Sequence, residues 1–372
     1  MYSLTKLWTY SHAKPVLRLL TRDLDGNGRK EVIATTQNGE LLILNTNGTL
    51  LFKNAITENK AIYAIKVKDI TQNGNLELII GSMDGLLRIF TIGSNLHLHS
   101  LWAHTFGGNI NGILIDDITG DSKLELMAYS LDKSVRVLNS ESGELIWAQM
   151  FEKGIGDARI IEDIKFESQK IIVACGNDGT LRIFKGKDGE LLWFKKFANK
   201  LRTVTAFSIL DTPIFICGGD EKELYYINRE NHATIAKLSF SDYIWACKSY
   251  PLRSPTALLM STYSYAYLYP NNTKDLSYTS QLLYLNTAEG ISWQLKGVNV
   301  EHFKKFESNQ KKFIALCTTE GWLLLVEEQN GKIYSLNHEP SCINDIAYNN
   351  NSEMIVTSNN SGEVNAYTLK IH

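Results

Sequence analysis

The sequence has no long apolar run and no excess of either charge. In 372 residues no stretch approaches the ~18 consecutive apolar residues of a membrane-spanning helix, so we expect no membrane insertion. The 38 basic and 40 acidic residues nearly cancel, which leaves no overall charge that would favour nucleic acid. Five scattered cysteines form no disulfide framework, and the first residues, MYSLTKLWTYSHAK, lack the apolar core of a signal peptide. These absences predict a soluble, cytoplasmic protein.

The sequence does contain a motif that recurs about every 46 residues, a period typical of β-propellers. Three clear copies occupy residues 81–106, 129–151 and 176–197. Each copy combines short apolar runs, such as those at 31–36, 76–82 and 170–176, with tight turns that contain Asn-Gly or Asp-Gly. Such pairs favour hairpins because type I′ turns need positive φ. The pattern predicts four antiparallel strands per repeat, which is one propeller blade.

Counting the repeats gives eight blades. The sixth copy is worn and must lie around residues 256–270, so a count of seven stays open. The last copy ends at His372 after its third strand, whereas residues 4–10 match the fourth-strand phrase and carry its tryptophan, Trp8. We therefore expect an all-β chain in which residues 1–372 form a single closed propeller domain, with the N-terminal strand completing the last blade. This arrangement would remove an open sheet edge.

Several phrases resemble known propeller families. The run DGTLRIFKGKDGELLW resembles the repeat of the quinoprotein-dehydrogenase-like (PQQ-like) propellers, in which a Gly-x-x-x-Trp element packs between adjacent blades. Residues 23–31, DLDGNGRKE, resemble the calcium loop of FG-GAP and integrin-alpha-type propellers, and the last copy is similar to a WD40 repeat. The run DITQNGNLELIIGSMDGLLRIF resembles the scaffold propellers of the Bardet–Biedl trafficking complex.

The loop at residues 23–31 is a candidate calcium site. Alternating oxygen ligands with a closing carboxylate can wrap one hard cation. The candidate ligands are the side chains of Asp23, Asp25, Asn27 and Glu31 and the carbonyl of Arg29. Alternatively, these residues only stabilise the turn through Asx-type hydrogen bonds. The two following repeats have Thr71 and Thr119 where this loop has its third-position carboxylate, so metal is less expected there.

Two further sets of residues are candidates for partner binding. Arg88, Arg136 and Arg182 recur at one position of three consecutive repeats and point away from their apolar neighbours. They form either a row that docks an acidic partner or locally paired surface arginines. Four tyrosines alternate in the irregular sixth repeat, preceded by Trp245, and aromatic residues of this kind pack between blades or form interfaces. These are Tyr263, Tyr265, Tyr267 and Tyr269.

The function we predict is a non-catalytic scaffold for protein–protein interaction. The chain has neither the adjacent cysteines nor the leader expected of a quinoprotein enzyme, and no other catalytic spacing is evident. No cofactor is required, although calcium fits the loop at residues 23–31. The Bardet–Biedl-type resemblance implies a subunit of a multi-protein trafficking or small-GTPase-regulating assembly. The alternatives are a small-ligand or glycan-binding propeller and a relic of a quinoprotein-like enzyme.

Overall fold

The computed structural model describes the chain except for residues 1, 163–168, 210–211, 251–256, 264–280 and 287–289. The described residues form eight antiparallel sheets of four strands each, in the order of propeller blades. The fold is therefore all-β, and the predicted count of eight blades is confirmed. The only described helix is a single 3-10 turn, η1 (Ser94–Leu96), and no described helix is long and apolar enough to cross a membrane.

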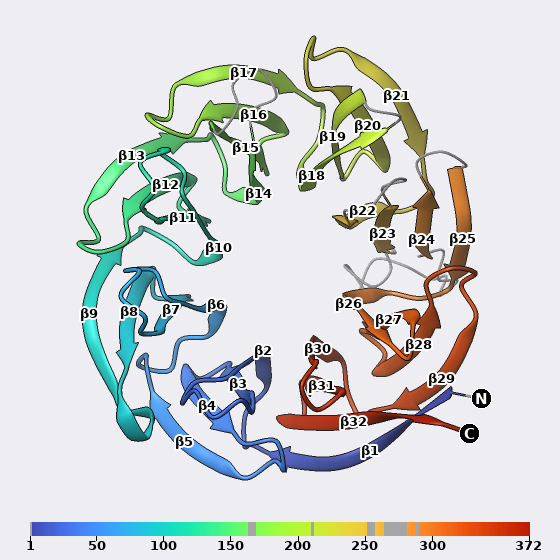
Figure 1. Ribbon diagram of the computed structural model, residues 1–372. Coiled ribbons are helices and arrows are strands. Elements are labelled where there is room, and N and C mark those ends of the chain that lie inside the picture. Colours follow the sequence, from blue (N-terminus) through green and yellow to red (C-terminus); the bar gives the residue numbers. More distant parts are fainter. Residues whose placement is uncertain (1, 163–168, 210–211, 251–256, 264–280, 287–289) are drawn as a thin grey trace. The chain divides into compact units, whose positions relative to one another are not determined.

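By its internal contacts the chain divides into two compact units, residues 1–110 with 300–372 and residues 111–299. Each is described here by itself, and the expectation of one domain over residues 1–372 stays a prediction. Unit 1 holds four blades (Figure 1). Their strands are β2 (Val16–Arg22), β3 (Glu31–Thr36), β4 (Glu40–Leu44) and β5 (Leu50–Ala55); β6 (Ile62–Lys68), β7 (Glu77–Ser82), β8 (Leu86–Ile92) and β9 (Leu98–Thr105); β26 (Val300–Ser308), β27 (Lys311–Thr318), β28 (Trp322–Glu327) and β29 (Ile333–His338); and β30 (Ile343–Asn349), β31 (Met354–Asn359), β32 (Glu363–Ile371) and β1 (Tyr2–Ser11).

Unit 2 holds the other four blades. Their strands are β10 (Ile110–Asp116), β11 (Glu125–Ser130), β12 (Ser134–Asn139) and β13 (Leu145–Met150); β14 (Ile155–Glu162), β15 (Lys170–Gly176), β16 (Thr180–Lys185) and β17 (Leu191–Lys196); β18 (Leu201–Ile209), β19 (Thr212–Gly219), β20 (Glu223–Asn228) and β21 (Thr234–Ser239); and β22 (Tyr243–Tyr250), β23 (Ala257–Tyr263), β24 (Gln281–Asn286) and β25 (Gly290–Lys296). The sixth blade, β22–β25, is the one that the sequence left uncertain.

The N-terminal strand completes the last blade, as predicted. β1 pairs with β32 in antiparallel register from Tyr2 opposite Ile371 to Ser11 opposite Glu363, so the sheet order is β1-β32-β31-β30. The two ends of the sequence are thereby held in one sheet, and the outer edge of β32 is covered by β1.

The core lies between blades, because the middle strands of each blade are buried on both faces. All six residues of β3, β7 and β11 are buried, which agrees with their nearly continuous apolar sequences. In unit 2 one cluster joins Val137 of β12 to Ile172 of β15 and Phe184 of β16. Each blade therefore buries its apolar faces only when it is stacked on its neighbours.

The Gly-x-x-x-Trp element of the repeat acts between neighbouring blades. The indole N–H of Trp147 donates to the carbonyl of Gly186 at 2.7 Å, and its ring lies against Gly189. In unit 1 the indole N–H of Trp8 likewise donates to the carbonyl of Thr46 at 2.8 Å. Trp193 stacks instead on His232, which lies at the corresponding turn, with 4.7 Å between the two ring centroids. An outer-strand tryptophan thus docks on the turn of the next blade.

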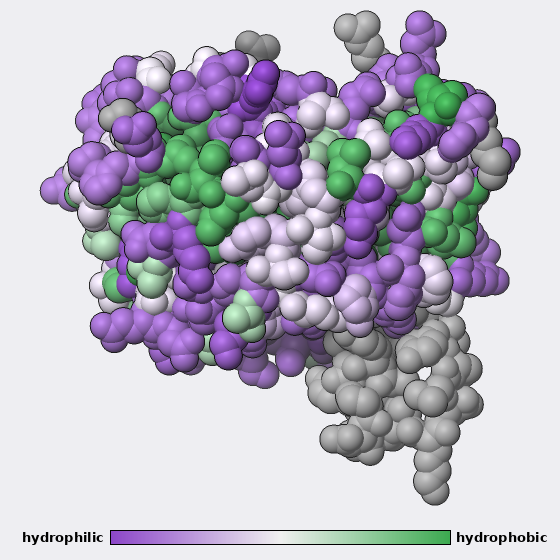
Figure 2. All heavy atoms as spheres, turned by 90° about the horizontal axis from the view of Figure 1, so that it is seen from below, coloured by the Kyte–Doolittle hydropathy of each residue, from purple (hydrophilic) through white to green (hydrophobic). Residues whose placement is uncertain are grey.

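The outer strands are exposed, but bulges interrupt their edges. In unit 1 Leu7 of β1 and Leu51 of β5 are each the extra residue at a shift in strand register. Their side chains are 52% and 49% exposed. Figure 2 faces the side that carries β1 and β5 and shows apolar side chains among hydrophilic ones. Because a bulge disrupts the ladder and twists the edge, it discourages another chain from pairing there.

The Trp147 contact predicts a specific cost for a side chain at Gly189. An added Cβ would lie 2.6 Å from the indole, and the residue also has a positive φ of 73°. Gly120 has a φ of 81° but open space around its Cβ, which makes Gly120→Ala a matched control for backbone strain. We expect Gly189→Ala to lower the free energy of unfolding by about 1–3 kcal/mol more than Gly120→Ala, because of overpacking. Urea denaturation measures the difference, and equal losses would contradict the docking role of Trp147.

Candidate functional site

The three recurring arginines are engaged within their own hairpins. Arg88 pairs with Asp84 at 2.7 Å, Arg136 with Asp132 at 2.9 Å and Arg182 with Asp178 at 3.3 Å, and the arginine side chains are only 18–21% exposed. These contacts support the alternative of locally paired arginines. A role in docking an acidic partner stays a prediction.

Arg182 shows how completely such a guanidinium is used. It also donates to the hydroxyl of Thr180 and to the carbonyl of Met150, and it lies 4.1 Å from the ring centroid of Phe151. Partial burial alone would raise the pKa of Asp178, but hydrogen bonds from Thr180 and Glu152 and the charge of Arg182 hold it below its usual value. The pair is thus part of the hairpin's own structure.

The candidate calcium loop brings three carboxylates together. Oxygen atoms of Asp23, Asp25 and Glu31 lie within 4.8 Å of one another. Burial, followed by the neighbouring charges of Asp25 and Asp23, raises the pKa of Glu31, although the backbone N–H of Leu24 opposes this rise. Asn27 accepts a hydrogen bond from the backbone N–H of Arg29 at 2.7 Å. The donor set has the oxygen chemistry of a calcium site.

The same loop has a hydrogen-bonded frame that does not depend on a metal. Asp23 accepts the backbone N–H groups of Gly26 and Gly28, each at 2.8 Å. The frame recurs where the third-position carboxylate is missing: Asp69 accepts from Gly74 at 2.8 Å, and Asp117 accepts from Ser122 at 3.0 Å. The frame alone therefore explains why the acidic residue recurs. Calcium at residues 23–31 stays a prediction, which a calcium titration of Asp25→Asn against the unchanged chain decides.

The tyrosine stripe is only partly within the described chain. Tyr263 ends β23 and pairs there with Tyr243 of β22. Tyr265, Tyr267 and Tyr269 lie outside the described residues, so the predicted alternation over these positions is untested. Trp245, predicted with them, lies on β22 and lines a pocket.

This pocket of about 290 Å³ lies in unit 2, beside the first strands of its blades, which are the innermost strands of the unit in Figure 1. We call it the Arg202 pocket. It is lined by Asn111, Ile155, Gly156, Asn177, Arg202 and Trp245. Of these residues the sequence analysis had named only Trp245.

Two β-bulges position the two largest side chains of the Arg202 pocket, one in β18 and one in β22. The register of β18 with β19 shifts between Leu201 and Thr203, which leaves Arg202 as the extra residue. The register of β22 with β23 shifts between Ile244 and Ala246, which does the same for Trp245. A bulge re-aims a side chain without requiring it to fit the ladder. The extra residues of five further blades occupy the same repeat position; they are Leu17, Tyr63, Gly156, Glu301 and Asn344.

The sequence carried a signal for this position. At or near the start of the first strand of every repeat, an aliphatic residue is followed by a variable one, as in Leu201-Arg202 and Ile244-Trp245. The aliphatic residue is fully or almost fully buried, whereas the variable residue changes from leucine to glycine to tryptophan. A column that varies inside an otherwise regular repeat indicates a position that the repeated strand pairing does not restrict.

Arg202 is held between an acidic and an aromatic partner. Its Nε forms a short ion pair with Oδ1 of Asp220, and its guanidinium carbon lies 5.1 Å from the centroid of the Trp245 ring and 5.8 Å from that of Tyr243. Lys222 lies 5.6 Å from the Tyr243 centroid and donates to the carbonyl of Ser241 at 2.7 Å. Two cations thus lie against two aromatic rings, and one of the cations is paired with a carboxylate.

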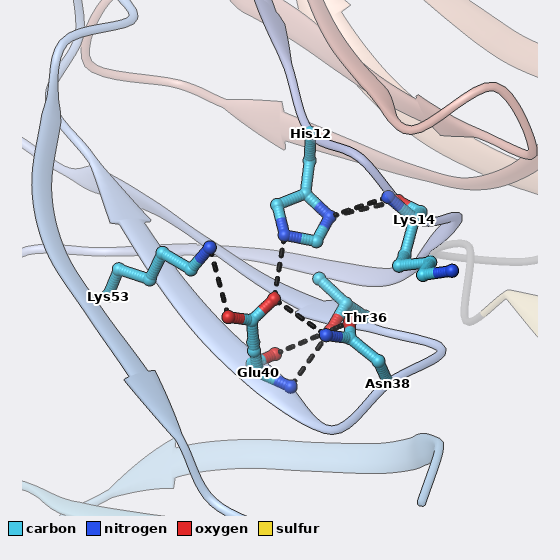
Figure 3. A network of polar contacts seen from close by, with 6 residues as sticks. All are labelled: His12, Lys14, Thr36, Asn38, Glu40 and Lys53. Carbon is cyan, nitrogen blue, oxygen red and sulfur yellow. Dashed lines mark hydrogen bonds and ion pairs between the residues drawn. The ribbon is translucent and has the colours of Figure 1, made fainter. Parts of the chain in front are cut away.

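A second polar network, in unit 1, fixes the hairpin of β3 and β4 (Figure 3). Glu40 receives hydrogen bonds from His12 at 2.7 Å and Asn38 at 2.8 Å and pairs with Lys53 at 2.9 Å. Its side chain is 16% exposed. Partial burial alone would raise the pKa of Glu40, but the hydrogen bonds from Asn38, Lys53 and His12 hold it below its ordinary value of 4.5.

Comparisons with known proteins place the fold but not the function. No family model matches the chain, and no curated protein matches it. The structure is similar to that of Sqt1 from Saccharomyces cerevisiae, with 12% identity, a TM-score of 0.74 and coverage of 98% of this chain and 99% of that one. BamB from Moraxella catarrhalis gives 15% identity, a TM-score of 0.66 and coverage of 99% and 98%. The WD40 β-propeller domain of Doa1 gives 11% identity, a TM-score of 0.56 and coverage of 98% of this chain and 96% of that one.

At these identities the likeness shows the fold alone. The chain is an eight-bladed β-propeller, as its repeats had indicated.

The Glu40 network predicts acid sensitivity. Because the folded-state pKa of Glu40 is lowered, its contribution to stability is present above the unfolded value of 4.5 and is lost as the pH falls through the folded pKa. We expect Glu40→Gln to lower the free energy of unfolding at pH 7 by about 1.5–3 kcal/mol and to weaken its pH dependence below pH 5. Denaturant titrations between pH 7 and pH 3 measure both effects. Glu58→Gln, at an exposed position of the same unit, is the control, and an equal change in both variants would contradict the role of the network.

Proposed function

We propose that this chain is a non-catalytic protein-interaction propeller that binds a segment of a partner protein at the Arg202 pocket. One observation carries the proposal: the bulge positions of two neighbouring blades place an arginine and a tryptophan against each other in a pocket. Arginine, tryptophan and tyrosine are the residues most enriched at the energetic centres of protein interfaces. Bulged residues can serve recognition because the ladder does not depend on them.

The similarity to solved propellers supports this proposal at the level of the fold. Sqt1 and the WD40 domain of Doa1 match this chain over almost its whole length. A propeller supplies a rigid framework, and rigid elements hold a recognition residue more accurately than loops do. From the resemblance of residues 69–90 to Bardet–Biedl-type propellers, we further propose that the partner belongs to a multi-protein trafficking or small-GTPase-regulating assembly.

The state of the cysteines supports a non-catalytic role in a reducing compartment. None of the five cysteines forms a disulfide, and Cys175, Cys217, Cys247 and Cys317 are buried. Burial raises the pKa of these four thiols far above the ordinary value, so they remain protonated and pack as small apolar groups. Unpaired thiols are usual in the cytoplasm, which is the compartment we propose. The near-neutral charge favours a protein partner over nucleic acid.

A second candidate function is the binding of a small neutral ligand such as a glycan. The amides of Asn111 and Asn177 beside the ring of Trp245 favour this reading, because sugars hydrogen-bond to amides and pack on aromatic rings. The pocket lies at the lower end of the volumes typical of ligand sites, about 300–1,000 Å³. A thermal-shift screen with neutral sugars separates the two functions, since only a glycan-binding site responds to them.

The proposal predicts which tryptophan carries partner binding. In affinity capture of the full-length chain from its native cells at gentle salt, we expect Trp245→Ala to reduce a stoichiometric partner about tenfold or more, as is typical of an interface centre. Trp322, 41% exposed on β28 and outside the pocket, supplies the control Trp322→Ala, which should retain the partner. Recovery of no stoichiometric partner, or equal retention by both variants, would sink the proposal.

A further inference from the structure

We propose that the Arg202 pocket binds a carboxylate carried by the partner segment, with the guanidinium of Arg202 as the group that recognises it. This inference rests on the proposed function and names the chemistry of its ligand. It follows from the way in which the guanidinium is held, from the donors that it leaves unused and from the size of the pocket.

The guanidinium is oriented but only partly used. Of the five N–H donors of Arg202, the one on Nε donates to Asp220. Within the described part of the chain, no other acceptor hydrogen-bonds to this guanidinium. The two rings beside it, Trp245 and Tyr243, fix the position of its planar group. The side chain is 20% exposed and lines the pocket. The paired Nη donors therefore form a fork that is already in place, which is the arrangement that binds a carboxylate through two parallel hydrogen bonds.

Arg182 of the same unit provides the contrast. It is exposed to a similar extent, pairs with a turn aspartate and lies over an aromatic ring. Unlike Arg202, it also donates to Met150 and Thr180, so its Nε and both Nη groups are engaged within the chain. The unit thus contains one arginine whose donors are used for structure and another, lining a pocket, whose terminal donors have no acceptor among the described residues.

The surroundings favour a single acidic group over a larger anion. The attraction comes from the free terminal fork of Arg202 and not from an excess of positive charge, because Glu221 and Asp242 stand next to Asp220 and Tyr243 in the sequence and balance Lys222. A volume of about 290 Å³ is small for a cofactor and suits the end of one side chain or of one peptide. Asn177 lines the same pocket and its amide is suited to hydrogen-bonding with a peptide backbone, whereas Asn111 donates its amide N–H to the carbonyl of Ile155 at 3.2 Å.

Asp220 sets the direction of a second effect. A bound carboxylate and Asp220 would share one guanidinium, and two neighbouring carboxylates repel each other. Removal of the charge at Asp220 should therefore strengthen binding, whereas removal of the charge at Arg202 should abolish it. A pocket in which Arg202 acts only by packing would not show these opposite responses.

The experiment uses the full chain labelled with 5-fluorotryptophan, whose seven signals are resolved by 19F NMR and assigned through Trp→Phe variants such as Trp245→Phe. The probes are the tripeptides Ac-Gly-Glu-Gly-NH2, with a side-chain carboxylate, Ac-Gly-Gln-Gly-OH, with a terminal carboxylate, and Ac-Gly-Gln-Gly-NH2, with neither. We expect a carboxylate probe to shift the Trp245 signal and to bind about tenfold or more tightly than the neutral one, as a charge-assisted hydrogen bond provides. The two carboxylate probes distinguish the sources of the group.

Four variants complete the test. Arg202→Gln should lose the response to carboxylate probes, Asp220→Asn should strengthen it, and Arg182→Gln should leave it unchanged. The signals of the other tryptophans report whether each variant remains folded, and Arg202→Lys, which keeps the charge without the fork, should bind more weakly. An equal response to the neutral probe, or a response that survives Arg202→Gln, would overturn the inference.

These outcomes are separable from those of the proposed function. If a partner is captured through Trp245 while no carboxylate probe moves its signal, the inference fails and the proposed function stands. If carboxylates bind through Arg202 while no stoichiometric partner is recovered, the proposed function fails and the inference about the ligand group stands.

Discussion

The contact on which the structure depends is the packing of one blade on the turn of the next. A single four-stranded blade has apolar residues on both faces of its middle strands and cannot bury them alone. The outer-strand tryptophan, seated on a glycine turn as Trp147 is on Gly189, fixes how far one blade can approach its neighbour. That constraint accounts for the repeat of the tryptophan, of the glycine and of the spacing between them.

The bulges separate strand pairing from recognition. In the seven first strands whose bulge is described, the residue before the bulge is buried and the ladder resumes after it. Strand pairing therefore does not restrict the extra residue, and its neighbours decide its size: a Cβ on Gly156 of β14 would lie 2.5 Å from the carbonyl oxygen of Leu201, whereas β18 holds an arginine and β22 a tryptophan at this position. The recurring arginines have structural partners within their own hairpins: Arg88, Arg136 and Arg182 pair with their turn aspartates. Arg202 differs because its aspartate occupies only one of its donors.

The sequence predicted the repeating parts well. The strands expected at 31–36 and 170–176 coincide with β3 and β15, and the N-terminal strand with Trp8 completes the last blade. The recurring loop acids were also recognised, but turn frame and calcium ligand could not be told apart because both use the same carboxylates. Arg202 was missed, since pattern reasoning searches for what repeats and this residue occupies a column that varies. Trp245 was found only as one of several neighbouring aromatic residues.

By itself the sequence determined the fold class and the way the last blade is completed, and it favoured eight blades over seven, a choice that the structure settled. These features follow from local rules, namely strand periodicity, turn chemistry and the spacing of one motif, which act within a few tens of residues. Only the tertiary structure decided which charged groups are used up and which are presented. The sequence shows that Arg182 recurs and Arg202 does not, but their roles depend on atoms contributed by other strands: the carbonyl of Met150 for one, the rings of Tyr243 and Trp245 for the other. Such contacts join residues more than 30 positions apart, beyond the reach of any local rule.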